Sequence, residues 1–269
     1  MRWAVVGLAM LGMASAASAA DYRPPVLRGS QWDSTVPNYR DWSGFYVGGH
    51  IGYSSATADF GEGGSSIIAD ILRLSVLETE FSVSQWVSPG GHGNGTPFGL
   101  FFGYNWQSED AVFGVDFIYS HSSILAGGTD SLARNVTTSG GDNYDVFVSA
   151  TMGSKITDML SIRGRGGVSY GPFLPYATLG VAVARLDVVR TATVTTVEDP
   201  GGVPIVASES RDESRKGAFG YGLSAGLGFD WEVFPQLFLR AEYEYLALAA
   251  VEDIKISIHT ARAGVGVKF

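Results

Sequence analysis

His121 and Ser123 come nearest to a catalytic arrangement in type and spacing. They stand in His121-Ser122-Ser123, at the outer end of a predicted strand. Successive side chains of a strand point to opposite faces, so these two share a face. A histidine can activate a serine hydroxyl as a nucleophile when a third group orients the histidine. The sequence assigns no orienting carboxylate, so a solvated strand end is preferred and a hydrolase site is the alternative.

Two other histidines carry weaker signals. His50 lies among glycines on the predicted inward face of a strand and is expected to be a satisfied interior histidine. His92 lies in Gly90-Gly-His-Gly-Asn-Gly95, where metal binding is the alternative to a flexible loop. This glycine stretch lacks the strand–turn–helix context and the lysine of a phosphate-binding loop. We therefore predict no cofactor and no metal site.

Charged residues of both signs recur at alternate positions inside apolar segments, which places them on one face of a sheet. The set predicted to point inward is Asp116, Arg163, Arg165, Asp230, Glu232, Arg240, Glu242, Glu244 and Arg262. Buried charges cost several kcal/mol each unless they are paired. A salt-bridge network that holds an interior shut is the preferred interpretation, and a narrow charge-lined pore is the alternative.

The last ten residues, 260–269, show which elements position these charges. Ala261, Ala263, Val265, Val267 and Phe269 alternate with polar residues or glycine. This period of two predicts a strand with one apolar and one charged face. In an outer-membrane barrel the apolar face meets lipid, and the strand ends at an aromatic girdle.

Eight segments with this period predict an all-β fold, an eight-stranded antiparallel up-and-down transmembrane β-barrel. The expected strands are 44–58, 96–107, 111–123, 160–170, 175–188, 219–233, 237–250 and the segment that ends at Phe269. Long loops at 59–95, 124–142 and 189–216 alternate with short turns, as in bacterial barrels whose short turns face the periplasm. A short helix is expected within 67–77, and 144–155 is expected to extend the sheet above the membrane.

Aromatic side chains on the outward positions gather near the predicted strand ends, where interfacial girdles lie. They are Phe45, Tyr53, Trp106, Tyr170, Trp231, Tyr245 and Phe269. One stretch does not fit the pattern, because Ile254, Ile256 and Ile258 share the inward parity of Arg262. Either a bulge reverses the register near His259, or this stretch stands above the bilayer.

The N-terminal residues read as targeting segments. Residues 1–20 have a positive start, a short apolar run and an Ala17-Ser18-Ala19 cleavage site, which predicts a cleaved signal peptide with the cut after Ala19 or Ala20. The apolar run is shorter than the ~20 residues of a membrane-spanning helix. Residues 21–43 contain three prolines and read as a periplasmic leader. Residues 44–269 form the predicted barrel domain.

Composition excludes some classes of function. The chain has no cysteine, so neither a disulfide framework nor a thiolate metal site is expected. The net charge is −9 and is spread along the chain, whereas nucleic-acid binding asks for a basic patch. Glycine is abundant, with 36 residues, and glycine inside strands marks close backbone approach or barrel curvature.

Three stretches resemble the opacity-protein-like and surface-antigen outer-membrane proteins of alphaproteobacteria, often labelled the "porin family". Asp41-Trp-Ser-Gly-Phe-Tyr-Val-Gly-Gly-His-Ile-Gly-Tyr53 resembles their opening strand. Leu160–Tyr176 resembles their hallmark hairpin, with Arg163, Arg165, Pro175 and Tyr176 in the matching places. The segment from Arg240 to Phe269 resembles their closing hairpin. The large first two loops and residues 155–159 depart from the pattern, so loop-dependent properties do not carry over.

The resemblance implies an eight-stranded barrel in the outer membrane, with an envelope-integrity or surface-antigen role and no catalytic residues. The expected partners are outer-membrane lipid and lipopolysaccharide, and the barrel-assembly machinery through the strand that ends at Phe269. No nucleic-acid partner is expected, and homo-oligomerisation is left open. The family label does not establish conduction, so a narrow small-solute porin stays as the alternative function. A second alternative is a lipid A-modifying hydrolase, since His121-Ser122-Ser123 resembles the H-x-S element of outer-membrane lipid A deacylases.

Overall fold

The computed structural model describes residues 40–199, 203–251 and 254–269, which belong to the unit Asn38–Phe269. The predicted signal peptide 1–20 and residues 21–39 of the predicted leader lie outside the described residues.

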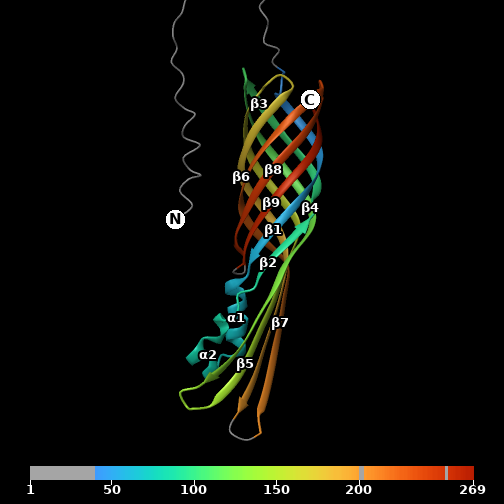
Figure 1. Cartoon of the computed structure of the whole chain (residues 1–269). Helices are drawn as coiled ribbons and strands as arrows, with labels where there is room; N and C mark the ends of the chain where they lie inside the picture. The colour runs from blue at the N-terminus through green and yellow to red at the C-terminus, as the bar shows by residue number, and fades with distance from the viewer. Residues whose placement is uncertain (1–39, 200–202, 252–253) are drawn as a thin grey trace, which may run out of the picture. The chain divides into compact units, whose positions relative to one another are not determined.

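Eight strands form a closed antiparallel ring, which confirms the predicted barrel (Figure 1). They are β1 (Gly44–Asp59), β3 (Phe98–Ser108), β4 (Ala111–Thr137), β5 (Asn143–Val168), β6 (Phe173–Asp199), β7 (Ile205–Phe234), β8 (Leu237–Val251) and β9 (Ile254–Lys268). Each strand pairs with the next, and the ring closes between β1 and β9, from Tyr46↔Lys268 to Asp59↔Lys255. Closure leaves no free edge along this part of the sheet.

Side chains alternate strictly between the two faces of the ring. Leu223 and Leu227 on β7 are 66% and 60% exposed, while Ser224 between them is fully buried. The inward residues Arg163 and Glu242 are 1% and 5% exposed. The wall therefore presents apolar side chains to its surroundings, as a barrel in lipid requires, and turns its charged side chains toward the interior.

The strands β4, β5, β6 and β7 continue beyond the barrel as a four-stranded sheet, named the extension here (Figure 1). It comprises residues 124–137, 143–156, 188–199 and 205–215. The expected loops 124–142 and 189–216 are therefore wrong as loops, and only short connections remain at the tip. The expectation that 144–155 extends the sheet is correct. Threonine and valine dominate 188–197, and such β-branched residues favour strands even where the segment is polar.

The barrel passes into the extension through a row of register shifts. They lie between His121 and Ile124, between Ile156 and Asp158, and between Leu186 and Val188, on three successive strand pairs. A bulge places one extra residue on one strand and bends the sheet locally.

The expected loop 59–95 is mostly folded, which corrects that expectation. It contains α1 (Gly61–Ile71), α2 (Val76–Phe81), the 3₁₀ helix η1 (Val83–Gln85) and β2 (Gly90–Gly95). The single helix expected within 67–77 is two helices. The glycine stretch forms β2, which pairs with β1 and β4. Glycine is needed there, because a side chain at Gly91 or Gly93 would overlap the β4 backbone. Among the described residues, no helix is long and apolar enough to cross a membrane.

The helices pack on one face of the extension. Apolar residues of the two helices and η1, such as Ile68, Leu72 and Val83, form a buried cluster with Val148 on β5 and Val194 on β6. Helix α2 is tied to the β4–β5 turn, because the Ser139 hydroxyl and N–H donate to Glu80 at 2.5 and 2.9 Å. These bonds lower the pKa of Glu80. The extension is thus a sheet with one covered face and one open face.

The barrel interior near the extension is apolar. Its buried residues include Phe60, Ile156, Leu248, Ile256 and Ile258. The β8–β9 pairing runs without a shift from Leu237↔Val267 to Leu248↔Ile256, so no bulge reverses the register near His259. Ile256 and Ile258 point inward because this layer of the interior is apolar. Of the two alternatives given for this stretch, a bulge that reverses the register near His259 is wrong.

We predict that the close strand approach at Gly48 makes this position intolerant of a methyl group. A Cβ there would overlap the Phe101 ring and the Val265 carbonyl oxygen, so the backbone must move. Gly48→Ala is expected to destabilise the barrel by about 1–3 kcal/mol in urea unfolding in detergent micelles.

The matched control is Gly49→Ala, because a Cβ at Gly49 meets its nearest atom at 3.7 Å. This variant is expected to change the free energy of unfolding by less than about 0.5 kcal/mol. Equal effects of the two substitutions would contradict the packing described for Gly48.

Candidate functional site

The charged layer of the barrel interior is the candidate site, and Arg163 on β5 lies at its centre. Its guanidinium donates to Asp116 on β4 at 2.6 Å and to Glu242 on β8 at 2.8 and 3.0 Å. A further bond of 3.2 Å reaches Glu244. The side chain is fully buried. Arg163 therefore joins two parts of the wall that are not neighbours in the sheet.

Asp230 on β7 holds two further arginines of this layer. It accepts from Arg165 at 2.8 Å and from Arg240 at 2.8 and 3.0 Å. Arg240 also reaches Asp116 at 3.3 Å, which connects this group to Arg163. The Arg165 guanidinium stacks 3.9 Å from the centre of the Tyr176 ring, so its apolar face is covered as well.

Arg262 on β9 completes the layer. It bonds to Glu244 and lies 3.6 Å from Glu242. The layer then contains four arginines and four carboxylates, and it is formally neutral. Balanced charge with direct bonds is the condition under which buried ions are tolerated.

Three hydroxyl groups that the sequence reasoning missed complete the carboxylate shells. Tyr46 donates to Asp116 at 2.6 Å, Tyr176 donates to Glu242 at 2.9 Å, and Ser224 donates to Glu244 at 2.9 Å. The sequence does place all three on inward positions of their strands, and a buried hydroxyl group beside a carboxylate is expected to donate to it.

Glu232 lies apart from this layer, near the end of the barrel that carries the short turns. It pairs with Arg40 at 3.1 Å and with Lys268. Trp42 packs there against Phe238, with ring centres 6.2 Å apart. Residues 40–43 of the predicted leader thus close this end of the barrel. In the same segment, the hydroxyl and N–H of Ser43 donate to the Asp41 carboxylate, and these two bonds lower the pKa of Asp41.

The seven predicted interface aromatics all lie on the outward face and are exposed. Phe45, Trp106, Tyr170, Trp231 and Phe269 lie toward the end with the short turns, and Tyr53 and Tyr245 lie toward the extension. Phe45 contacts Tyr104 edge to face at 4.7 Å, and Tyr245 lies 4.8 Å from His259.

His121 and Ser123 lie on the outward face beside the row of register shifts, and both are exposed. His121 Nδ1 lies 2.9 Å from Asp158 Oδ1, and Tyr119 donates to the same oxygen at 2.8 Å. The sequence reasoning missed Asp158 as an orienting carboxylate, since the register that places it opposite His121 is a tertiary property.

His50 and His92, the two histidines with weaker sequence signals, have ordinary partners. His50 is buried, with Nε2 3.0 Å from the Ser120 hydroxyl. His92 is exposed on β2, with Nδ1 3.2 Å from the Thr57 hydroxyl. Within the described ranges, no group of three histidine, aspartate or glutamate side chains is placed to hold a metal ion.

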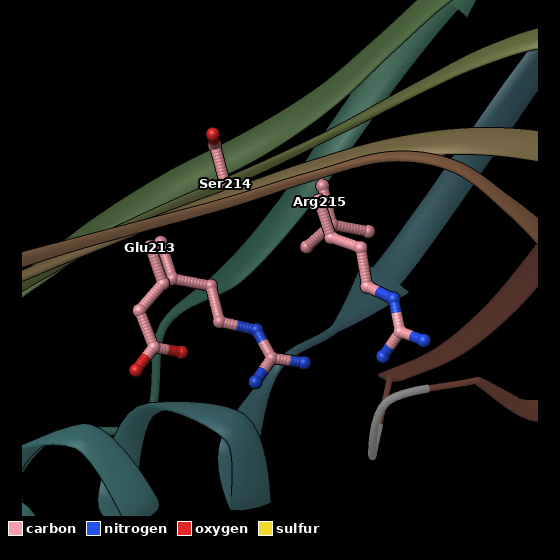
Figure 2. Close-up of a pocket in the computed structure, with 5 residues that line it drawn as sticks. Glu213, Ser214 and Arg215 are labelled. Carbon is pink, nitrogen blue, oxygen red and sulfur yellow. The ribbon is translucent and has the colours of Figure 1, made fainter.

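A pocket of about 350 Å³ lies where β6 and β7 enter the extension. Its lining includes Arg190, Glu213 and Arg215. Figure 2 shows the Glu213 carboxylate and the Arg215 guanidinium on one side of the sheet, toward the helices, and Ser214 on the other. Charged side chains of this part of β7 therefore face the helices. One of them, Arg211, pairs with Asp70 of α1 at 2.9 Å.

We predict that Arg163 cannot be removed without a large loss of stability. Arg163→Met leaves Asp116 and Glu242 without their closest cation, so unfolding in urea is expected to show a loss of about 3–5 kcal/mol. The control is Arg185→Met, at an exposed position of β6, with an expected change below about 0.5 kcal/mol. A loss below about 1 kcal/mol for Arg163→Met would show that the layer is hydrated.

Comparison with known proteins agrees with this architecture. Residues 6–269 match the family described as "Outer membrane protein beta-barrel domain". The chain is 25% identical over 238 residues to the 22 kDa outer membrane protein of Rhizobium leguminosarum bv. viciae, across 85% of this chain and 78% of that protein.

Two solved structures are among those similar to this chain. The attachment invasion locus protein Ail of Yersinia pestis is 17% identical, with a TM-score of 0.33, across 85% of this chain and all of that chain. The outer membrane protein OprG from Pseudomonas aeruginosa is 14% identical, with a TM-score of 0.38, across 86% of this chain and 98% of that chain. The assignment rests on the family match and on the strand pairing described above. The chain belongs to the outer-membrane β-barrel domain family and resides in the outer membrane.

Proposed function

We propose that the protein is a sealed structural barrel that maintains the envelope and presents its folded extension, as a surface antigen, on the outside of the cell. The observation that carries this proposal is the two-layer interior. A neutral charged layer lies toward the short turns, and an apolar layer that includes Phe60, Ile156 and Ile258 lies toward the extension. An ion that crossed the barrel would have to lose its water in the apolar layer, which costs several kcal/mol or more.

Inward glycines could leave space for a narrow pore, but aromatic side chains fill the space beside three of them. A Cβ at Gly48 would overlap the Phe101 ring, one at Gly103 the Tyr46 hydroxyl, and one at Gly266 the Phe238 ring. The glycines therefore make room for aromatic side chains of neighbouring strands rather than for solvent.

We predict that the purified protein, refolded from urea and inserted into planar lipid bilayers, gives no single-channel steps. The two interior layers are expected to block small ions as well as solutes. An established porin measured in the same bilayers serves as the positive control. Reproducible steps that follow the concentration of refolded protein would remove the sealed-barrel proposal in favour of a narrow pore.

A second candidate function is favoured by one contact. Asp158 orients His121, and Ser123 lies two residues further along the same outward face. This arrangement supplies the third group that a serine hydrolase acting on lipid A requires. The structural role does not require a catalytic function of this group, because a histidine bonded to a carboxylate at a strand end is common on solvated surfaces.

A single substitution separates the two roles. Under the structural proposal, Ser123→Ala leaves the lipid A mass profile of expressing cells identical to that of cells with the unaltered protein. Cells without the protein are the reference. A lipid A species that disappears with Ser123→Ala, and not with the neighbouring Ser122→Ala, would establish the hydrolase instead.

A further inference from the structure

The open face of the extension carries rows of hydroxyl groups and is named the hydroxyl face. Its members point away from the helices on all four strands, and they are Thr129, Ser131, Ser149, Thr151, Thr191, Thr193, Thr195, Ser208 and Ser210. Several pair across strands, with Thr129 2.9 Å from Thr151, Thr193 3.0 Å from Ser210 and Thr195 2.9 Å from Ser208. A hydroxyl that makes one such bond keeps the capacity for another.

The two faces of the extension differ sharply in charge. Arg211, Glu213 and Arg215 point toward the helices, whereas Ser214 points away (Figure 2). On the open face the charged side chains beside the hydroxyl rows are carboxylates such as Asp145. The hydroxyl face is thus mainly polar and poor in cations, although Arg134 lies at its edge.

One aromatic ring lies within this polar surface. Phe147 on β5 is 44% exposed and lines a groove of about 290 Å³ with Asn135, Asp145 and Thr195. Asn135 donates to Asp145 at 2.9 Å, which fixes an amide and a carboxylate beside the ring. An apolar platform with a few fixed polar groups is the usual make-up of a small-molecule site. A sugar ring has one C–H face and a rim of hydroxyl groups, and it matches this make-up.

The chemistry changes in order along the outward surface from the barrel to the hydroxyl face. Apolar side chains such as Leu223 come first, and the exposed cations Lys155 and Arg185 follow at the row of register shifts. Two carboxylates share this height. Asp158 is bonded to His121, and Asp187 accepts from the Gly217 N–H at 2.8 Å. The hydroxyl rows come next.

This order parallels the order of chemical groups in lipopolysaccharide, which are acyl chains, phosphorylated glucosamines and then an oligosaccharide. We propose that the hydroxyl face binds the oligosaccharide of the lipopolysaccharide molecules that surround the barrel in the outer leaflet. Phe147 provides the ring against which a sugar packs, and Asn135, Asp145 and Thr195 bond to its hydroxyl groups. The inference rests on the outward placement of the extension in the proposed function and does not depend on whether the barrel conducts.

The test compares two forms of lipopolysaccharide on the full-length mature protein in phospholipid nanodiscs. One form has a complete core oligosaccharide, and the other is truncated to lipid A with its first two acidic sugars. The apparent Kd of each labelled form is measured by titration. The complete form is expected to bind at least about tenfold more tightly, because several sugar hydroxyl groups add contacts.

The variants remove the contacts without changing the sheet. Thr193→Val and Thr195→Val, combined with Phe147→Ala, are expected to weaken the binding of the complete form at least about fivefold and to leave the truncated form unchanged. The control is Thr196→Val on the same strand, because Thr196 faces the helices and should have no effect. If the combined variant does not refold, Asn135→Ala at the exposed rim of the groove is measured in its place.

Equal Kd values for the two forms, or wild-type binding by the combined variant, would overturn the proposal. A third arm uses the free core oligosaccharide, released from its lipid. Tighter binding of this free sugar than of the complete lipopolysaccharide would show that the face serves glycans from outside the cell, and it too would overturn the assignment. Channel activity in bilayers would overturn the sealed barrel and leave these binding results intact.

Discussion

Every charge inside so narrow a barrel must find its counter-charge within the wall, and the rest of the structure depends on this requirement. Arg163 meets it by binding Asp116 on β4 and both Glu242 and Glu244 on β8. The bonds to Glu242 and Glu244 cross the interior and join β5 to β8, two strands that share no backbone hydrogen bonds, whereas Asp116 lies opposite Arg163 on the neighbouring strand β4. The pairing therefore sets the distance between opposite parts of the wall, and the aromatic and apolar layers pack on either side of it.

The glycines and aromatic rings of the interior depend on each other. Phe101, Phe238 and Tyr46 have room to turn inward because glycines of adjacent strands leave space beside them. The same rings cover the guanidinium groups, with Arg240 stacked 4.2 Å from the centre of Phe101. A cation between aromatic faces loses less on leaving water than it would in an aliphatic core. The interior is consequently dense although glycine is frequent.

Sequence reasoning predicted the barrel well, because the alternation of faces is local. The inward charges and outward aromatics follow from parity alone, and the structure places them accordingly. What the sequence could not provide is register: Asp158 meets His121 only through the pairing of β4 with β5. Residues 189–197 and 205–215 were expected to be loop, because alternation between the two faces loses its contrast where both faces meet water. The β-branched residues of 188–197 were the overlooked signal.

The row of register shifts at the rim separates two parts of the sheet that are free to change independently. Strand pairing below the row is held by closure of the ring, while pairing above it is held by neighbouring hairpins and by the helices packed on one face. Adding two residues to each strand of a hairpin tip would lengthen the extension and keep the parity of both its faces. The lipid-embedded part would keep its register under such changes. Such a change in length would alter the extension and leave the pairing of the buried charges as it is.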